Sequence, residues 1–144
     1  MTASGSDPSL PSLLLNSHTD VVPVTFEKWS HDPFGAKIID GRIYARGSQD
    51  MKGVGMAYLS AVREVKRSAH GLKRTVHISF VPDEEIGGFD GMKAFVKSEL
   101  FRSLNVGYAL DEGVPCPFDS FLLFNDERVP WCMRLMMITI VFLI

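Results

Sequence analysis

The chain has 144 residues, of which 46% are hydrophobic and 22% are charged, and its formal net charge at pH 7 is −2. This composition is typical of one globular domain and excludes a disordered tail. No concentration of basic residues favours a nucleic-acid partner. The two cysteines, Cys116 and Cys132, lack the spacing of a metal site or of a disulfide framework. We therefore expect reduced thiols in a cytoplasmic protein.

The two ends of the chain differ in character. Residues 1–12 are rich in Ser, Pro and Gly and contain no apolar core like that of a signal peptide, so they predict a flexible segment. Residues 135–144 are nearly all apolar and reach about half the length of a membrane span. They predict a buried strand and no membrane partner, with a membrane anchor as the less favoured alternative.

The first predicted strand covers residues 13–15, an apolar run that suits a strand buried on both faces. It leads directly to His18 and Asp20, which are two residues apart and point the same way in extended backbone. A histidine with a carboxylate behind it is a plausible metal ligand with its orienting group. On its own, a histidine after a strand is more often a loop residue.

A hairpin is predicted for residues 36–39 and 42–45, because they flank the turn pair Asp40-Gly41. A helix is predicted for residues 51–68 from apolar residues at helical spacing, with Gly71 as its C-terminal cap.

The start of this helix combines two glycines with a carboxylate. Gly53 and Gly55 weaken its first turn and suggest a close approach of the backbone to a neighbour. Asp50 precedes the helix and suits either an N-terminal cap or a metal ligand.

The next predicted strand, residues 75–81, ends at Pro82 and is followed by three adjacent carboxylates at 83–85. Adjacent carboxylates repel one another unless a cation or water is near. A solvated acidic loop is one interpretation. Gly87 and Gly88 instead indicate a specific backbone path, which favours a site.

The remaining predicted elements are a helix over 91–100, a strand over 106–110, a strand over 120–124 and a further strand from residue 129. Asp111 and Glu112 follow the strand over 106–110 directly. These alternating elements predict an α/β fold, with a mostly parallel sheet and helices on both faces.

Ligands of such sheets bind beyond the carboxyl ends of the strands, where the acidic residues and His18 are found. One imidazole with several carboxylates suits zinc, with cobalt and manganese as alternatives. A pair of ions needs a bridging carboxylate, and a base must accept a proton from water. Spacing alone assigns none of these roles.

Four motifs together resemble the aminoacylases, which are N-acyl-L-amino-acid amidohydrolases of the zinc metallopeptidase family that includes acetylornithine deacetylase. The motifs are Ser-His-Thr-Asp-Val-Val-Pro-Val at 17–24, Tyr-Ala-Arg-Gly-x-Gln-Asp-Met-Lys at 44–52, Phe-Val-Pro-Asp-Glu-Glu-x-Gly-Gly at 80–88 and Ala-Leu-Asp-Glu-Gly at 109–113. The resemblance runs from about Ser9 to about Trp131.

The resemblance implies a role for each matching residue. His18 and Glu112 would bind a first zinc ion, Glu85 a second ion, and Asp50 would bridge the two. Glu84 would be the general base and Asp20 the carboxylate behind His18. The implied reaction is hydrolysis of an N-acyl-L-amino acid by metal-activated water, with Glu84 taking the proton.

The same resemblance implies that residues 13–134 form an incomplete catalytic domain. Aminoacylase-like enzymes have an earlier segment, a lid or dimerisation domain that supplies a histidine, and a late histidine ligand for the second zinc ion. They form homodimers. An alternative expectation is therefore a truncated, catalytically inactive fragment that at most binds metal or a partner chain. The tail over 135–144 is unlike the family.

Overall fold

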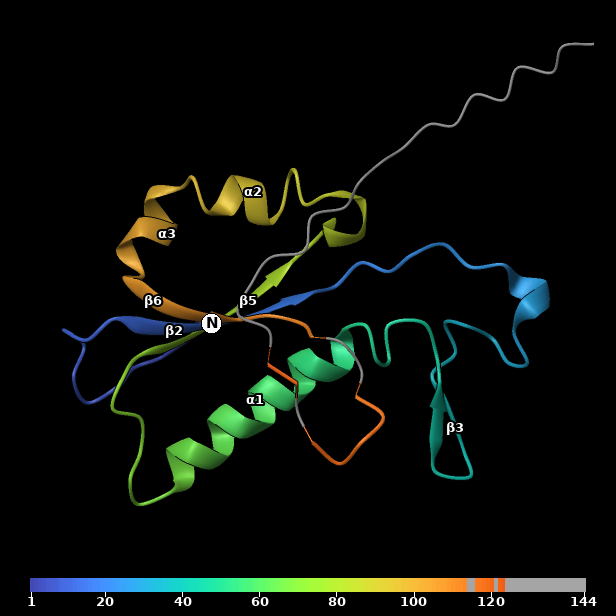
Figure 1. The fold of residues 1–144 in the computed structure, drawn as a ribbon, viewed down its shortest axis with the longest axis horizontal. Coiled ribbons are helices and arrows are strands. Elements are labelled where there is room, and N and C mark those ends of the chain that lie inside the picture. The colour runs from blue at the N-terminus through green and yellow to red at the C-terminus, as the bar shows by residue number, and fades with distance from the viewer. Residues whose placement is uncertain (114–115, 121, 124–144) are drawn as a thin grey trace, which may run out of the picture. The chain divides into compact units, whose positions relative to one another are not determined.

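The structure, a computed structural model, describes residues 1–113, 116–120 and 122–123. The chain divides into two units, Met1–Glu112 and Gly113–Ile144, and the helices and strands of the described residues all lie in the first unit. The first unit is a mixed α/β arrangement with one four-stranded sheet, a separate two-stranded hairpin and several helices (Figure 1).

The main sheet has the strand order β1-β5-β2-β6. Its strands are Thr2–Ala3 (β1), Ser12–His18 (β2), Val76–Val81 (β5) and Val106–Leu110 (β6). β2 runs parallel to both β5 and β6, whereas β1 pairs antiparallel with β5. His18 lies opposite Val81, and Leu15 lies opposite Leu110. The carboxyl ends of the three parallel strands therefore meet at one end of the sheet.

The burial of β2 reflects its interior position in the sheet, between β5 and β6. Six of its seven residues are buried, as expected for an apolar run covered on both faces. Leu15, Val76 and Ile78 form the core cluster of β2 and β5. The side chains packed against this cluster are partly buried, and they are Leu13, Tyr58, Leu59, Val62 and Leu72. The predictions of strands at 13–15, 75–81 and 106–110 are confirmed.

The first residues of the chain depart from the expected flexible segment. Residues 2–3 form β1, and the amino group of Met1 donates a hydrogen bond to the carbonyl of Ile78 at 2.7 Å. Ser6 and Asp7 donate backbone hydrogen bonds to Leu72 and Lys73. These contacts are made with residues about 70 positions away in sequence, so local composition does not reveal them.

The helix predicted over 51–68 is confirmed as α1, Lys52–Arg67. It ends at Ser68, whose backbone is extended, so Gly71 is not its cap but lies in the following turn with φ +58°. A Cβ atom on Gly55 would come within 2.8 Å of the Ser17 hydroxyl oxygen and 3.0 Å of the Phe80 ring. The close approach predicted for this turn is therefore present.

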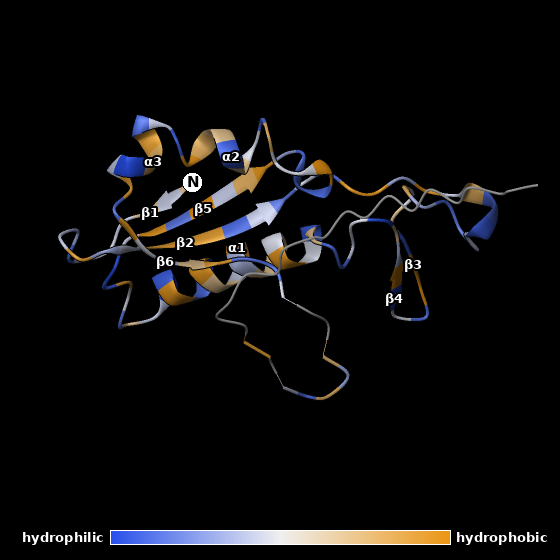
Figure 2. Ribbon diagram, turned by 45° about the horizontal axis from the view of Figure 1, so that its top comes forward, coloured by the Kyte–Doolittle hydropathy of each residue, from blue (hydrophilic) through white to orange (hydrophobic). Residues whose placement is uncertain are grey.

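The single helix predicted over 91–100 is wrong. The structure has two short helices there, α2 (Met92–Phe95) and α3 (Glu99–Ser103). Ser98 separates them because its hydroxyl accepts a hydrogen bond from the Phe101 amide at 3.1 Å and so caps α3. Figure 2 shows α1 below the sheet and these two helices above it.

The predicted hairpin is confirmed as β3 (Lys37–Ile39) and β4 (Arg42–Tyr44). Asp40 and Gly41 both have positive φ, as a two-residue turn of this kind requires. Two 3-10 helices complete the described elements, η1 (Phe26–Lys28) and η2 (Glu84–Ile86).

The strand predicted over 120–124 is absent at Ser120, Leu122 and Leu123, which form no regular element. Its other two positions, the strand predicted from residue 129 and the tail over 135–144 lie outside the described residues. Within the part of the chain that is described, none of the helices has the length and apolar character to cross a bilayer.

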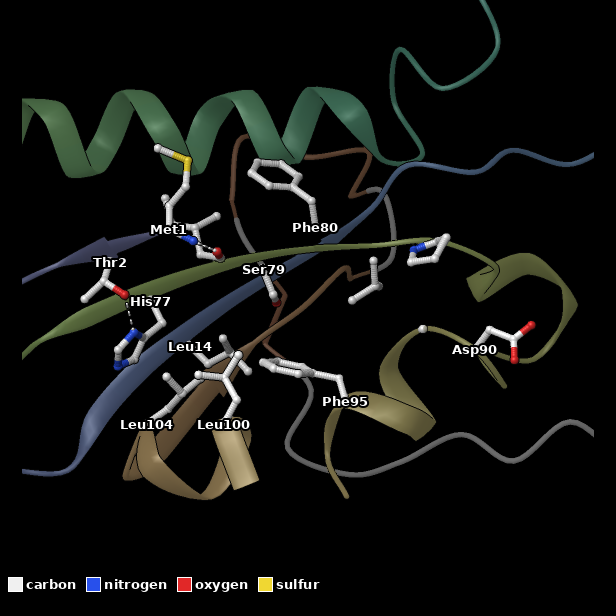
Figure 3. Close-up of a pocket in the computed structure, with 14 residues that line it drawn as sticks. Met1, Thr2, Leu14, His77, Ser79, Phe80, Asp90, Phe95, Leu100 and Leu104 are labelled. Carbon is white, nitrogen blue, oxygen red and sulfur yellow. Dashed lines mark hydrogen bonds between the residues drawn. The ribbon is translucent and has the colours of Figure 1, made fainter. Parts of the chain in front are cut away.

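A hollow of about 550 Å³ lies between β5 and the two short helices (Figure 3). Leu14, Phe95, Leu100 and Leu104 give it a largely apolar lining, and His77 accepts or donates a hydrogen bond with the Thr2 hydroxyl at its margin. The side chains predicted to bind metal do not line this hollow.

Candidate metal centre

Three side chains converge at the carboxyl end of the sheet. His18 is the last residue of β2, Asp50 lies two residues before α1, and Glu112 lies two residues after β6. His18 Nε2 is 2.9 Å from Asp50 Oδ1 and 3.6 Å from Glu112 Oε2. One nitrogen or oxygen from each of the three residues lies within 4.8 Å of the other two. The parallel strands thus bring together residues that are 94 positions apart in sequence.

Asp50 does not cap α1. The N-cap residue of the helix is Met51, and it makes no side-chain capping hydrogen bond. The Asp50 carboxylate instead lies against His18. Of the two roles that the sequence leaves open for Asp50, its position therefore favours a role in the site.

The His18 ring is buried and held from behind. Its Nδ1 atom donates a hydrogen bond to the backbone carbonyl of Asp20 at 3.0 Å, and the Asp20 carboxylate lies 3.4 Å away. The nearer acceptor is thus the carbonyl and not the carboxylate expected from the sequence. This hydrogen bond fixes the ring so that Nε2 faces the carboxylates of Asp50 and Glu112, an orientation that suits a metal ligand.

The Asp20 carboxylate has a different partner, the first turn of η2. Its two oxygens accept hydrogen bonds from the backbone amides of Glu84 and Glu85, each at 3.1 Å. Burial opposes ionisation, but these two amides and the neighbouring His18 outweigh it and lower the pKa of Asp20. Asp20 therefore links the end of β2 to the acidic loop.

The acidic loop follows the specific path that its glycines indicate. Asp83 has φ +62° and Gly87 has φ +108°, so the loop turns sharply at both ends of η2. The Asp83 carboxylate accepts hydrogen bonds from the amides of Asp90 and Gly91, at 2.8 and 3.0 Å. A freely solvated acidic loop would not need these contacts.

The two glutamates of this loop are placed differently. Glu84 Oε2 lies 3.8 Å from His18 Nε2, at the edge of the cluster. The side chain of Glu85 is not in the converging group of His18, Asp50 and Glu112. Of the four residues predicted to bind metal, the structure brings three together.

The pKa values of the cluster show how strongly these groups interact. Burial, together with the charges of Asp50 and Glu84, raises the pKa of Glu112 to about 7. Burial also raises the pKa of Glu84, and Asp50 adds to this effect. Burial alone would lower the pKa of His18, but the Asp20 carbonyl and the nearby carboxylates raise it overall.

These donors fit a zinc ion. An imidazole nitrogen and two carboxylates are ligands that zinc accepts, and they lie close enough to share one ion. The upward shift in the pKa of Glu112 arises partly from repulsion between carboxylates, and a cation at their centre would relieve that repulsion.

Comparison with known proteins gives the family. The profile of the family described as Peptidase family M20/M25/M40 matches residues 14–120, which include every residue of the cluster. The chain belongs to this family. Curated relatives include Aminoacylase-1 of Mus musculus, 58% identical over 135 residues, and Aminoacylase-1 of Dictyostelium discoideum, 51% identical over 133 residues.

The M20 chain spans about one third of the length of these relatives. The alignment with the Mus musculus protein covers 93% of this chain and 33% of the relative. Among solved structures, an M20 family metallo-carboxypeptidase from Sulfolobus solfataricus is similar with a TM-score of 0.68 and 30% identity, over 79% of this chain and 25% of that one. Human carnosine dipeptidase 1 is similar with a TM-score of 0.58 and 26% identity, over 76% and 24%.

Proposed function

We propose that this chain carries part of the catalytic site of a zinc-dependent amidohydrolase that converts N-acyl-L-amino acids to a carboxylate and a free amino acid. The substrate class is supported by the 58% identity to an Aminoacylase-1. The observation that carries the proposal is the convergence of His18, Asp50 and Glu112 in a chain of the M20 family. The proposed metal ligands are His18, Asp50, Glu85 and Glu112, and the proposed catalytic residues are Asp20 and Glu84.

In this proposal, His18 and Glu112 would hold a first zinc ion, and Asp50 would be a ligand shared with a second one. A bound zinc ion supplies Lewis-acid activation of water and of the acyl carbonyl. His18 suits its role because the Asp20 carbonyl fixes the ring with Nε2 toward Asp50 and Glu112.

Glu84 is the proposed general base. A base is most effective when its pKa lies near the working pH, and burial together with neighbouring carboxylates raises the pKa of Glu84. Asp20 holds the Glu84 amide and so positions the base beside His18. Glu84 would accept a proton from water and return it to the amine that leaves.

The proposal concerns the whole protein, because the curated relatives are about three times as long as this chain. A second zinc ion would need Glu85 to turn toward Asp50, and further ligands from outside the described residues. Residues 13–134 would form only part of the catalytic domain, with helices on both faces of the sheet and the metal site at the carboxyl ends of the strands. By its resemblance to the aminoacylases, the whole protein would be a cytoplasmic homodimer.

Zinc titration into the purified chain tests the site. Removing a side chain that hydrogen-bonds to a metal ligand weakens metal binding by about 10–100-fold. Removing the ligand itself should therefore weaken it by at least about 100-fold. We expect this loss for Asp50→Asn and for Glu112→Gln. Glu99→Gln is the matched control, because Glu99 is an exposed carboxylate in α3. Equal zinc affinity in all four proteins would refute the site.

A second candidate function is a chain that binds metal or a partner but does not catalyse. The position of the Glu85 side chain outside the converging group favours it, because a two-ion site then lacks a ligand. Release of acetate from N-acetyl-L-methionine by the zinc-loaded chain, with loss of that activity in Glu84→Gln, would exclude this alternative.

A further inference from the structure

A buried asparagine lies in the centre of the main sheet. Asn16 is 4% exposed and sits in β2 between the buried residues Leu15 and Ser17. A buried amide without hydrogen-bond partners costs free energy, so its contacts indicate its role. The motifs at 17–24 and 109–113 do not include Asn16, and the sequence alone did not indicate it as part of the site.

Asn16 makes one hydrogen bond to each neighbouring strand. Its Nδ2 atom donates to Asp111 Oδ2 at 2.9 Å, just beyond β6. Its Oδ1 atom accepts a hydrogen bond from the hydroxyl of Ser79 in β5 at 2.6 Å. Ser79 is the residue directly paired with Asn16 in the parallel ladder. We call the chain of contacts Ser79–Asn16–Asp111 the polar relay.

The direction of this relay follows from the chemistry of its ends. An ionised carboxylate only accepts hydrogen bonds, so the amide must turn its NH₂ group toward Asp111. The amide oxygen then faces Ser79, and the serine hydroxyl has to donate. Ser79 therefore fixes the orientation in which Asn16 can hold Asp111.

Asp111 is held at three points and connects directly to Glu112. Its Oδ2 atom is held by Asn16, and its backbone carbonyl accepts a hydrogen bond from the Tyr58 hydroxyl of α1 at 3.0 Å. Its Oδ1 atom accepts a hydrogen bond from the backbone amide of Glu112 at 2.8 Å. The backbone from which the Glu112 carboxylate extends toward His18 is thus tied to the relay.

We propose that Asn16 is a positioning residue, which directs the Glu112 carboxylate toward His18 by holding Asp111 through the polar relay. The proposal rests on the proposed function for the role of Glu112, but the relay itself depends only on the contacts of Asn16, Ser79 and Asp111. Asn16 would therefore set metal affinity without touching the ion.

Exchanging the two side chains at the centre of the relay provides the decisive test. Asn16→Asp places two carboxylates together and breaks the relay. The double variant Asn16→Asp/Asp111→Asn reverses donor and acceptor, because the new carboxylate accepts from Ser79 and from the new amide. That amide keeps an oxygen for the Glu112 backbone N–H. The net charge of the double variant equals that of the wild type.

The first measurement is amide hydrogen exchange of the metal-free chain, followed at Glu112 by NMR. Loss of one hydrogen bond should speed exchange of the Glu112 amide by about threefold to tenfold in Asn16→Asp, and the double variant should restore the slower rate. An unchanged rate in Asn16→Asp, or no restoration in the double variant, would overturn the relay.

The second measurement is the affinity for zinc alone. We expect about tenfold weaker binding in Asn16→Asp and recovery to within about threefold of wild type in the double variant. Ser12→Ala is the matched control. It removes a buried hydrogen bond, from Ser12 to the Leu104 carbonyl at 2.7 Å, at the opposite end of the same strand. Equal losses of zinc affinity in Ser12→Ala and Asn16→Asp would overturn the positioning role.

Together, hydrogen exchange and zinc affinity distinguish failure of the proposed zinc site from failure of the positioning role of Asn16. If the wild-type chain binds no zinc but the Glu112 amide responds to Asn16→Asp and recovers in the double variant, the proposed function fails and the relay stands. If zinc binds and neither measurement responds, the site stands and the positioning role of Asn16 is refuted.

Discussion

The ionisation of the Glu112 carboxylate depends strongly on its surroundings. Burial and the charges of Asp50 and Glu84 raise its pKa from 4.5 to about 7. An acid with a raised pKa in the folded chain binds its proton more tightly there than in the unfolded chain. Ionising Glu112 therefore lowers the stability of the metal-free fold as pH rises from about 4.5 through 7.

Loss of the proton from His18 lowers the stability of the metal-free fold, as ionisation of Glu112 does. Its pKa is raised above 6.5, so the stability that its charged form contributes is fully present below pH 6.5. That contribution is lost as pH rises through the pKa of the folded chain. Asp20 acts oppositely, but its pKa is lowered from 3.8, so its effect is confined to more acidic solutions.

We predict that the melting temperature of the metal-free chain falls by several degrees as pH rises from about 5 to about 8. Glu112→Gln carries no charge at any pH and should remove a large part of this slope, whereas Glu99→Gln should keep it. Thermal unfolding followed by circular dichroism across this range measures the slope. A flat profile for the wild type, or an unchanged slope in Glu112→Gln, would contradict this account.

Bound zinc should oppose this fall in stability with rising pH. Its ligands bind as carboxylates and as a neutral imidazole, so protons compete with the ion for Glu112 and His18. The stabilisation produced by a fixed concentration of zinc should therefore grow as pH rises from about 5 to about 8. Stabilisation that is constant across this range would mean that zinc binds elsewhere.

At the scale of elements, the first turn of α1 packs unusually close to the sheet. Gly55 is buried there against Ser17 of β2 and Phe80 of β5. Ser17 immediately precedes His18, so this contact also bears on the position of the candidate ligand. A side chain on Gly55 would have to displace one of these neighbours.

We predict that Gly55→Ala lowers the free energy of unfolding by up to about 2 kcal/mol. Alanine favours a helix by ~1 kcal/mol over glycine, but overpacking in a well-packed interior costs about 1–3 kcal/mol, and the built Cβ lies only 2.8 Å from the Ser17 oxygen. Urea unfolding measures the change. Ser60→Ala, at an exposed position of the same helix, is the control and should be neutral or slightly stabilising. A more stable Gly55→Ala would show that the contact is loose.

The elements that could be predicted are those with local sequence signals. The apolar run at 13–15, the helical spacing after residue 51 and the Asp40-Gly41 turn each act within a few residues. β1 could not be predicted, because two residues form a strand only by pairing with β5. The break between α2 and α3 depends on whether Ser98 caps a helix or continues one, and composition does not decide this.

In the candidate site, too, some features follow from the sequence pattern and others depend on contacts between distant residues. The rule that parallel strands present their ligands at their carboxyl ends predicts that His18 and Glu112 lie near each other, whereas the role of Asp50 before α1 is implied only by the resemblance to the aminoacylases. The rule cannot predict that Glu85 lies outside this group, because that depends on the direction of a side chain within η2. Asn16 could not be predicted either, since its role requires the register that pairs it with Ser79.

At the scale of the whole chain, β6 forms one edge of the main sheet in the part that is described. Tyr108 and Leu110 on this strand are 62% and 45% exposed. An edge strand with exposed apolar side chains readily pairs with another chain. The guanidinium group of Arg74 lies over the Tyr108 ring, 5.7 Å from its centroid. A charged side chain introduced at position 108 would therefore interact with Arg74.

We predict that the purified chain associates with itself through β6 and that Tyr108→Glu shifts this association to at least about tenfold higher concentration. Burying a large apolar side chain contributes ~1.5–3 kcal/mol, and a carboxylate at this position opposes pairing while still attracting Arg74 within the same chain. Analytical ultracentrifugation over a concentration series measures the shift. Ile38→Glu is the matched control, because Ile38 is 74% exposed on the separate hairpin and the substitution adds the same charge. If both variants weaken association equally, net charge and not the edge of the sheet controls it.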